Sequence, residues 1–298
     1  MSEGGGVRKR NERPIEGALF ASAILSIAIL GLIFLFLLKE ALPVFNSVTL
    51  PDFLFGREWF PASFKEPRYG ALPLIAGSLL VVATATLIAV PVGVACAIYI
   101  AEVADKRWGG ILKPLIEVLA GIPSVVYGFI SMVLLSSIVQ GVFGATYRLN
   151  ALNGALILAL MILPTIVSIA EDAISAVPRD YKEASLALGA TRWETIRKVS
   201  LPAARSGITV AVMLGLGRAV GETMAVLMAT GNSPVVTLDL LRSVETMTAV
   251  IAIEMGEVVF GSPHYHALFA IGLLLFLITF AVNLVVDIAV RRKEGLRR

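Results

Sequence analysis

The stretch DYKEASLALGATRWETIRKVSLP, residues 180–202, is the longest markedly polar segment between two apolar runs of this chain. Asp180 is followed three residues later by Glu183. This spacing is typical of a helix start, where side-chain oxygens accept hydrogen bonds from free backbone N–H groups. The stretch therefore predicts a helix that begins at Asp180.

A second helix is predicted after a glycine break. Gly189 stands where the first helix needs a residue in the left-handed conformation in order to end. Thr191 and Glu194 repeat the helix-start spacing, and Pro202 cannot continue the backbone hydrogen-bond ladder into the next apolar run. We expect helix, glycine, helix and proline, held outside a bilayer between two membrane spans.

The composition places most of the chain in a membrane. Of its 298 residues, 57% are hydrophobic and 16% are charged, and the mean hydropathy is +0.85. These values are too apolar for a soluble domain of this size. The net charge of +3 is small and comes from clustered Lys and Arg, so we expect membrane lipid, and no nucleic acid, among the partners.

Six apolar runs are long enough to cross a hydrocarbon core about 30 Å thick, which predicts an all-α integral membrane protein with six transmembrane helices. Pro91 predicts a kink or break in the second run. Residues 244–259 carry three glutamates, so a helix lying at the surface is expected there instead of a span. The expected spans are residues 18–38, 72–101, 114–139, 153–177, 203–230 and 267–290.

Charge asymmetry predicts the orientation. Six spans place both termini on one side, and the tails and loops of that side hold 18 Lys and Arg residues, against 6 on the other side. Both termini and the loop at residues 178–202 are therefore expected in the cytoplasm. The expected divisions are a tail (1–16), a first span with an extracytoplasmic segment (17–71), the main transmembrane domain (72–290, with a short charged loop at 102–113) and a second tail (291–298).

Two charges interrupt the fifth span, in the sequence GLGRAVGETMAV at residues 215–226. Arg218 and Glu222 lie one helical turn apart. Each costs roughly 2.5 to 3.5 kcal/mol to insert near the bilayer centre, so each should face protein or water. One interpretation is that the two side chains simply pair and lock the bundle. The other is that they lie on a translocation path, where the planar fork of Arg218 can bind an anion.

Helical spacing favours a path. One face of the fifth span is small and charged, and we expect it to face water, while Gly217 and Gly221 permit close helix approach beside it. That face consists of Ala211, Gly215, Arg218, Glu222, Ala225 and Ala229. Ser124 follows Pro123, and Thr165 follows Pro164. Either hydroxyl can face the path, although repair of a proline kink is the more conservative interpretation of both.

The chain shows no motif for chemistry of its own. It contains no G-x-x-x-x-G-K-[ST] loop to cradle ATP phosphates, and Cys96 is a lone cysteine in an apolar run. His264 and His266 have no ligands at metal spacing beside them. We therefore expect no enzyme and no metal or cofactor bound by this chain.

The polar stretch resembles the cytoplasmic EAA loop of ABC importer permeases. The matching residues are Glu183, Ala184, Gly189, Leu201 and Pro202. Ser185 departs from the usual Ala, and Val199 stands where Ile is common. The resemblance implies that these matching residues couple the permease to a partner ATPase that binds MgATP.

The resemblance extends over most of the chain from Tyr69 onward. The segments YGALPLIAGSLLV (69–81), AVPVGVACAIYIAE (89–102), LIEVLAGIPSVVYGF (115–129) and GRAVGETMAV (217–226) are similar to the permease subunits of the high-affinity phosphate ABC importer, of which the C subunit is the more similar. It implies the type I importer fold, a second permease subunit, two ATPase subunits and an extracytoplasmic phosphate-binding protein. It also implies functional roles for Arg218 and Glu222.

Two other functions stay open at this point. A permease for another oxyanion, such as sulfate or molybdate, would use Arg218 equally well. An ion-coupled secondary carrier would use Glu222 as a proton site, but it leaves the pattern at residues 180–202 unexplained.

Overall fold

The computed structural model describes residues 9–63 and 66–295. Over these residues the regular secondary structure is helical apart from one two-stranded hairpin, and six helical stretches are long and apolar enough to cross a membrane. The expected all-α membrane fold is therefore confirmed. The six stretches are Ile15–Asn46, Leu72–Val103, Ser124–Phe143, Ala151–Ser175, Arg192–Gly221 and Pro263–Leu284.

The elements in chain order are α1 (Lys9–Ala41), the 3-10 turn η1 (Leu42–Asn46), α2 (Leu50–Phe55), β1 (Trp59–Phe60), β2 (Arg68–Tyr69), α3 (Leu72–Ile98), the π-helical turn η2 (Tyr99–Val103), α4 (Lys106–Ala120), α5 (Ser124–Ile130), the π-helical turn η3 (Ser131–Leu135), α6 (Ser136–Phe143), α7 (Ala151–Ser175), α8 (Arg179–Ala187), α9 (Arg192–Thr195), the π-helical turn η4 (Ile196–Ser200), α10 (Leu201–Gly221), α11 (Met224–Thr230), α12 (Met247–Glu254) and α13 (Pro263–Gly295).

Helix α7 is the centre of the bundle, with α3 and α10 packed against it. Small residues allow the close approach. A Cβ atom added at Gly207 or Gly215 of α10 would collide with Ala173 or Ile166 of α7, respectively. In lipid, helix association depends on such close packing, because surrounding acyl chains are as apolar as the helices themselves.

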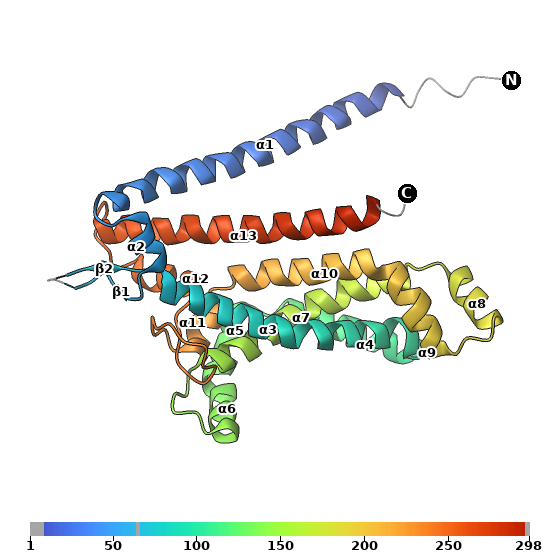
Figure 1. Ribbon diagram of the computed structural model, residues 1–298. Helices are drawn as coiled ribbons and strands as arrows, with labels where there is room; N and C mark the ends of the chain where they lie inside the picture. Colours follow the sequence, from blue (N-terminus) through green and yellow to red (C-terminus); the bar gives the residue numbers. More distant parts are fainter. Residues whose placement is uncertain (1–8, 64–65, 296–298) are drawn as a thin grey trace.

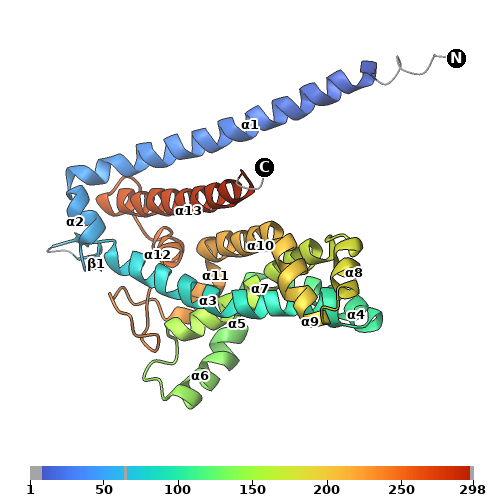
Figure 2. The same ribbon diagram turned by 45° about the vertical axis from the view of Figure 1, so that its right-hand side comes forward.

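Helices α1 and α13 form the periphery of the bundle and lie side by side (Figures 1 and 2). Phe36 of α1 meets Phe269 of α13 edge to face at a centroid distance of 5.7 Å. Most apolar side chains of α1 are exposed, as expected for a lipid-facing span. Because α1 already begins at Lys9, the expected polar tail is helical from that residue, and residues 1–8 lie outside the described part.

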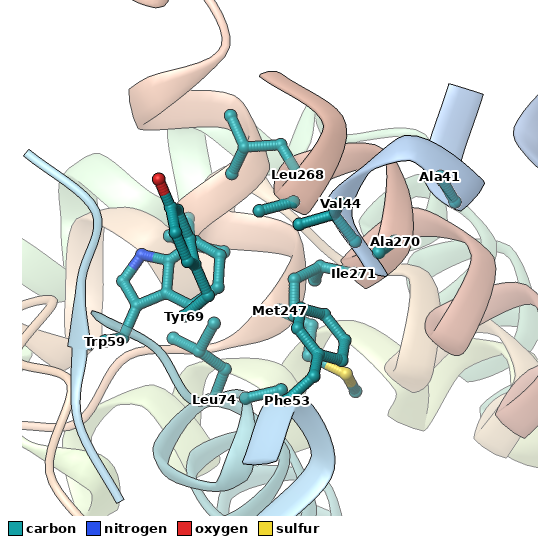
Figure 3. Packing of buried hydrophobic residues seen from close by; sticks show 13 residues of the cluster. Ala41, Val44, Phe53, Trp59, Tyr69, Leu74, Met247, Leu268, Ala270 and Ile271 are labelled. Atoms are coloured by element: carbon teal, nitrogen blue, oxygen red, sulfur yellow. The ribbon is translucent and has the colours of Figure 1, made fainter. Parts of the chain in front are cut away.

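The β1–β2 hairpin, α2 and α12 meet at one end of the bundle, called here the hairpin end. Phe53, Trp59, Tyr69 and Met247 pack there with residues of α13 in one apolar cluster (Figure 3). Trp59 pairs with Tyr69 across the hairpin. The opposite end carries α8 and α9 and is called here the α8 end (Figure 1).

The surface helix expected at residues 244–259 is partly wrong. A helix does form there, and it is not a span, but its first residues are buried. The reason is that Met247 and Val250 pack into the apolar cluster of the hairpin end. At the other end of the helix, the carboxylate of Glu254 accepts a hydrogen bond from Trp59 Nε1 at 3.1 Å and lies 2.7 Å from His264 Nε2.

The prolines have different effects in the second and third spans. Helix α3 continues through Pro91 without a break. The expected third span breaks at residues 121–123, where the backbone of Pro123 is extended, with ψ 140°, and caps the start of α5. The expected loop at residues 102–113 is mostly helix α4, and the third membrane-long stretch begins only at Ser124, later than the expected start at residue 114.

Candidate functional site

Arg218 lies in the last turn of α10 and is half-buried. Its Nη1 donates a hydrogen bond to Thr165 Oγ1 of α7 at 3.4 Å. Among the side chains that the structure describes, which do not include those of Asp287 and Glu294, no carboxylate lies within 4.0 Å of this guanidinium. Among these side chains, the charged fork inside a transmembrane helix has one neutral hydroxyl partner.

Glu222 does not pair with Arg218. Helix α10 ends at Gly221, and Glu222 is extended, with φ −69° and ψ 129°. Its Oε1 accepts a hydrogen bond from the backbone N–H of Ala225 at 3.1 Å, which stabilises the start of α11. Contact over a four-residue spacing needs a continuous helix, and the break at Glu222 removes it. The interpretation that the pair locks the bundle is therefore wrong.

The fifth span is thus two helices, α10 and α11, where one span to Thr230 was expected. Its small residues do not face water. Ala211, Ala225 and Ala229 are fully buried within the chain, and Gly215 packs on Ile166. The expected water-facing stripe is wrong at these four small residues, while Arg218 and Glu222 are half-buried.

Gly217 and Gly221 do not support a close helix contact within this chain. A Cβ atom at Gly221 would meet nothing within 4 Å, and one at Gly217 would meet only Asn283 Oδ1 at 3.8 Å. The close approach lies elsewhere, between α5 and α11, where a Cβ at Gly128 would come within 2.8 Å of Met228 Sδ.

Ser124 is the first residue of α5, directly after the break in the third span. The hydroxyl of Tyr127 donates to the carbonyl of Leu119 at 2.8 Å and so bridges this break. Among the described hydrogen bonds, none joins Ser124 to Arg218. Of the residues expected on the path, the structure brings together Arg218 and Thr165, and it leaves Ser124 as the start of a half-helix.

The polar stretch at the α8 end forms a helical hairpin. Gly189 adopts φ +86° between α8 and α9, as predicted. Thr191 and Glu194 form the predicted capping box, in which Thr191 N donates to Glu194 Oε2 at 3.0 Å. Asp180 is not a cap, because Pro178 occupies the N-cap position and Asp180 lies inside the first turn.

Pro202 does not separate a loop helix from the membrane helix. The helix runs from Arg192 to Gly221 through the π-helical turn η4, which ends just before Pro202. The backbone N–H of Leu201 bonds to the carbonyl of Ile196, five residues earlier. This wider turn accommodates the missing N–H of Pro202, so Leu201 and Pro202 lie in a helix that joins the hairpin rigidly to the span.

The coupling residues named from the sequence therefore fall on both helices of this hairpin. Glu183 and Ala184 are exposed on α8, and Leu201 and Pro202 are half-buried at the start of α10. The hairpin also exposes large apolar side chains, with Leu188 90% and Trp193 61% exposed.

Two ion-pair groups at the α8 end were missed from the sequence. Lys113 of α4 lies 2.6 Å from Asp172 Oδ1 and also contacts Glu171. The hydrogen bonds to these two carboxylates raise the pKa of Lys113 above its usual value. Lys182 of α8 pairs with Glu102 of η2. A local sequence pattern cannot predict these ion pairs, because the partners are 58 or more positions apart in the chain.

No group of three or more His, Cys, Asp or Glu side chains that could hold a metal ion occurs in the described ranges.

The six spans, the central α7 and the helical hairpin between the fourth and fifth spans define the permease fold of type I ABC importers. The structure superposes on the permease of a bacterial alginate ABC transporter, solved with an alginate-bound periplasmic protein, with a TM-score of 0.65. The sequence identity is 17%, over 94% of this chain and 96% of that one. The methionine transporter MetNI, in an inward-facing conformation, gives a TM-score of 0.56 at 20% identity, over 75% and 94% of the two chains.

The family of binding-protein-dependent transport system inner membrane components matches residues 89–295, and the chain belongs to this family. It is 41% identical to the probable ABC transporter permease protein YqgH of Bacillus subtilis, over 92% of this chain and 89% of that protein. It is 37% identical to the phosphate transport system permease protein PstC of Mesorhizobium japonicum, over 88% and 84% of the two chains.

Proposed function

We propose that this chain is the membrane-spanning permease subunit of an ATP-driven importer that carries inorganic phosphate across the inner membrane by alternating access. The assignment of phosphate as the transported substrate rests on the environment of Arg218. It is a guanidinium within a transmembrane helix that has a hydroxyl beside it and, among the side chains that the structure describes, no carboxylate within 4.0 Å. Phosphate matches its planar fork with paired oxygens. The names of the relatives, which include several phosphate transport permeases, support this choice.

The energy source in this proposal is a partner. The chain has no phosphate-cradling ATP motif, so two ATPase subunits bind MgATP and act on the helical hairpin. A second permease subunit completes the path, and an extracytoplasmic phosphate-binding protein delivers the cargo. The excess of Lys and Arg on one side supports a cytoplasmic location for the helical hairpin and both termini.

The mechanism follows from the rigid run between Arg192 and Gly221. A push on the hairpin moves α10 as one body, because the helix is continuous through Pro202. Arg218 lies in the last turn of that body, just before the break at Glu222. Its exposure to one side of the membrane or the other can therefore change with the position of α10.

The test is uptake of radiolabelled phosphate by the reconstituted complex. Arg218→Ala should lower uptake 10- to 100-fold, because hydrogen bonds to a charged group are each worth about 1.5–3 kcal/mol. Arg205→Ala is the matched control, since Arg205 is an exposed residue of the same helix and its loss should leave uptake unchanged. Normal uptake by the Arg218 variant, in a normally assembled complex, would contradict the assignment.

Two further measurements separate this function from the alternatives. Excess unlabelled phosphate should suppress uptake, and excess sulfate or molybdate should not. An ATPase should co-purify with this chain, whereas a secondary carrier would transport without one.

A further inference from the structure

A buried ion pair joins the helical hairpin to the second span. Lys182 Nζ of α8 lies 2.9 Å from Glu102 Oε1, and the two side chains are only 20% and 11% exposed. Glu102 belongs to the π-helical turn η2 that ends the second span, where the backbone N–H of Ala104 bonds to the carbonyl of Tyr99. Such turns are irregularities that occur frequently at functional sites.

The environment of this pair distinguishes it from an ordinary surface contact. Lys198 and Glu194 on the same hairpin are 3.2 Å apart, but their side chains are 70% and 43% exposed. Exposed pairs contribute little, since water screens both charges. Loss of one partner of a buried pair leaves the other charge desolvated and uncompensated. Loss of either Lys182 or Glu102 should therefore cost more than loss of a partner in the exposed pair, although Glu102 Oε1 accepts no hydrogen bond of good geometry from the described residues and the contact with Lys182 is electrostatic.

Apart from this ion pair, α8 makes few contacts with the second span. It packs mainly on α9 and η4, where Ser185 and Thr195 share a hydrogen bond of 3.0 Å. A cavity of about 130 Å³ borders both partners of the ion pair. Figure 1 shows α8 standing beyond the end of the bundle. The ion pair thus bridges a gap that apolar packing does not fill.

From η2, close packing along α3 leads toward Thr165 and Arg218. Gly93 of α3 lies against the side chain of Ile166, and Gly215 of α10 lies against the same side chain. Ile166 follows Thr165, which accepts the hydrogen bond from Arg218. Because interiors packed this closely do not deform freely, a displacement of α3 must also displace its neighbours.

We propose that the Glu102–Lys182 ion pair is a positioning contact that makes α3 follow α8, so that the second span moves together with the fifth when the hairpin is pushed. Without it, a push on α8 reaches α3 only indirectly, through α10 and α7. This inference rests on the proposed function, because another chain must act on α8. Neither residue touches the cargo.

The experiment uses the complete complex in proteoliposomes and measures phosphate uptake and ATP hydrolysis in the same vesicles. Glu102→Gln and Lys182→Met should each lower the phosphate moved per ATP about 10-fold, while ATP hydrolysis continues. The double exchange, Glu102→Lys with Lys182→Glu, should restore at least half of the ratio. Lys198→Met is the matched control, and it should leave the ratio unchanged.

A purely structural role predicts a different result. Uptake and hydrolysis would then fall in proportion to the amount of complex, and an unchanged ratio in the single variants overturns the proposal. So does a lowered ratio that the double exchange fails to restore. If the unaltered complex moves no phosphate, the proposed function itself fails, and this result is distinct from a failure of the ion pair.

Discussion

Arg218 and Glu222 show how a predicted pair can separate into two roles. Their four-residue spacing would allow an ion pair on a continuous helix, but the helix ends between them. Glu222 accepts a hydrogen bond from the backbone of α11 and does not pair with Arg218. The sequence located both charges inside a span and named Thr165 among the path residues. It could not show that Thr165 is the partner of Arg218, because the two are 53 positions apart.

The hydrogen bond from the backbone N–H of Ala225 to the Glu222 carboxylate predicts a contrast between two substitutions. Glu222→Gln keeps an oxygen that can accept the N–H of Ala225, so phosphate uptake should stay within about twofold of normal. Glu222→Ala removes that acceptor and should destabilise the protein by about 1 kcal/mol. Thermal unfolding and uptake of both variants provide the measurement. If Glu222→Gln abolishes uptake while the protein stays folded, the residue acts through its charge or its proton, as a secondary carrier would require.

Glu245 predicts a pH dependence of stability. It is 5% exposed and lies outside the six spans, and burial, with Glu254 nearby, raises the pKa of its carboxyl to about 8. The pKa in the unfolded chain is about 4.3, so between these two values the folded state holds more protons than the unfolded state. The stability must therefore fall as pH rises from about 4.3 to about 8, by at most ~1.4 kcal/mol per pH unit.

Melting temperatures of the purified protein across this pH range measure the effect. Glu245→Gln should flatten the slope and raise the melting temperature at pH 8, because the amide has no charge to desolvate. The same slope in this variant would show that Glu245 is not the titrating group. Glu66→Gln is a suitable control, since Glu66 is an exposed residue between strands β1 and β2.

The helical hairpin is the element that the sequence described best. Its glycine stop and its second capping signal both form, because each depends on residues within one turn of one another. The predicted start and end of the helical hairpin were wrong. Pro178 displaces the expected start at Asp180, and a π-helical turn carries the second helix through Pro202. Both differences reflect hydrogen-bond partners that the pattern of residue types leaves open.

Gly189 predicts how the hairpin transmits motion. Its φ of +86° is unfavourable for residues with a Cβ atom, although a Cβ there would meet nothing within 4 Å. Gly189→Val should therefore strain only the backbone, by about 1–2 kcal/mol, and should lower the phosphate moved per ATP. Gly189→Asn is the control, because Asn tolerates this conformation. Equal coupling ratios for the two variants would count against a role of the turn.

At the level of the bundle, α7 is enclosed by the other helices, while α1 and α13 cover one side and face lipid (Figure 2). The sequence showed which runs cross the membrane but not this arrangement. All six spans are apolar enough to cross a membrane, yet the share of buried residues in the most apolar 18-residue window is 61% for the α7 span and 0% for the first span. Hydropathy measures transfer into an apolar phase, and it does not distinguish lipid from protein as that phase.

The amino-acid pattern was sufficient for the membrane environment, the six spans, the glycine turn at Gly189 and the charge at Arg218. Each of these follows from the transfer free energy or backbone preference of residues close together in the chain. The breaks at residues 121–123 and at Glu222, the burial at the start of α12 and the ion pair between Glu102 and Lys182 required the folded structure. They depend on contacts between distant segments, whose free energies no local pattern records. The helical hairpin identifies a permease driven from outside the bilayer, and the packing around α7 shows which spans its motion can reach.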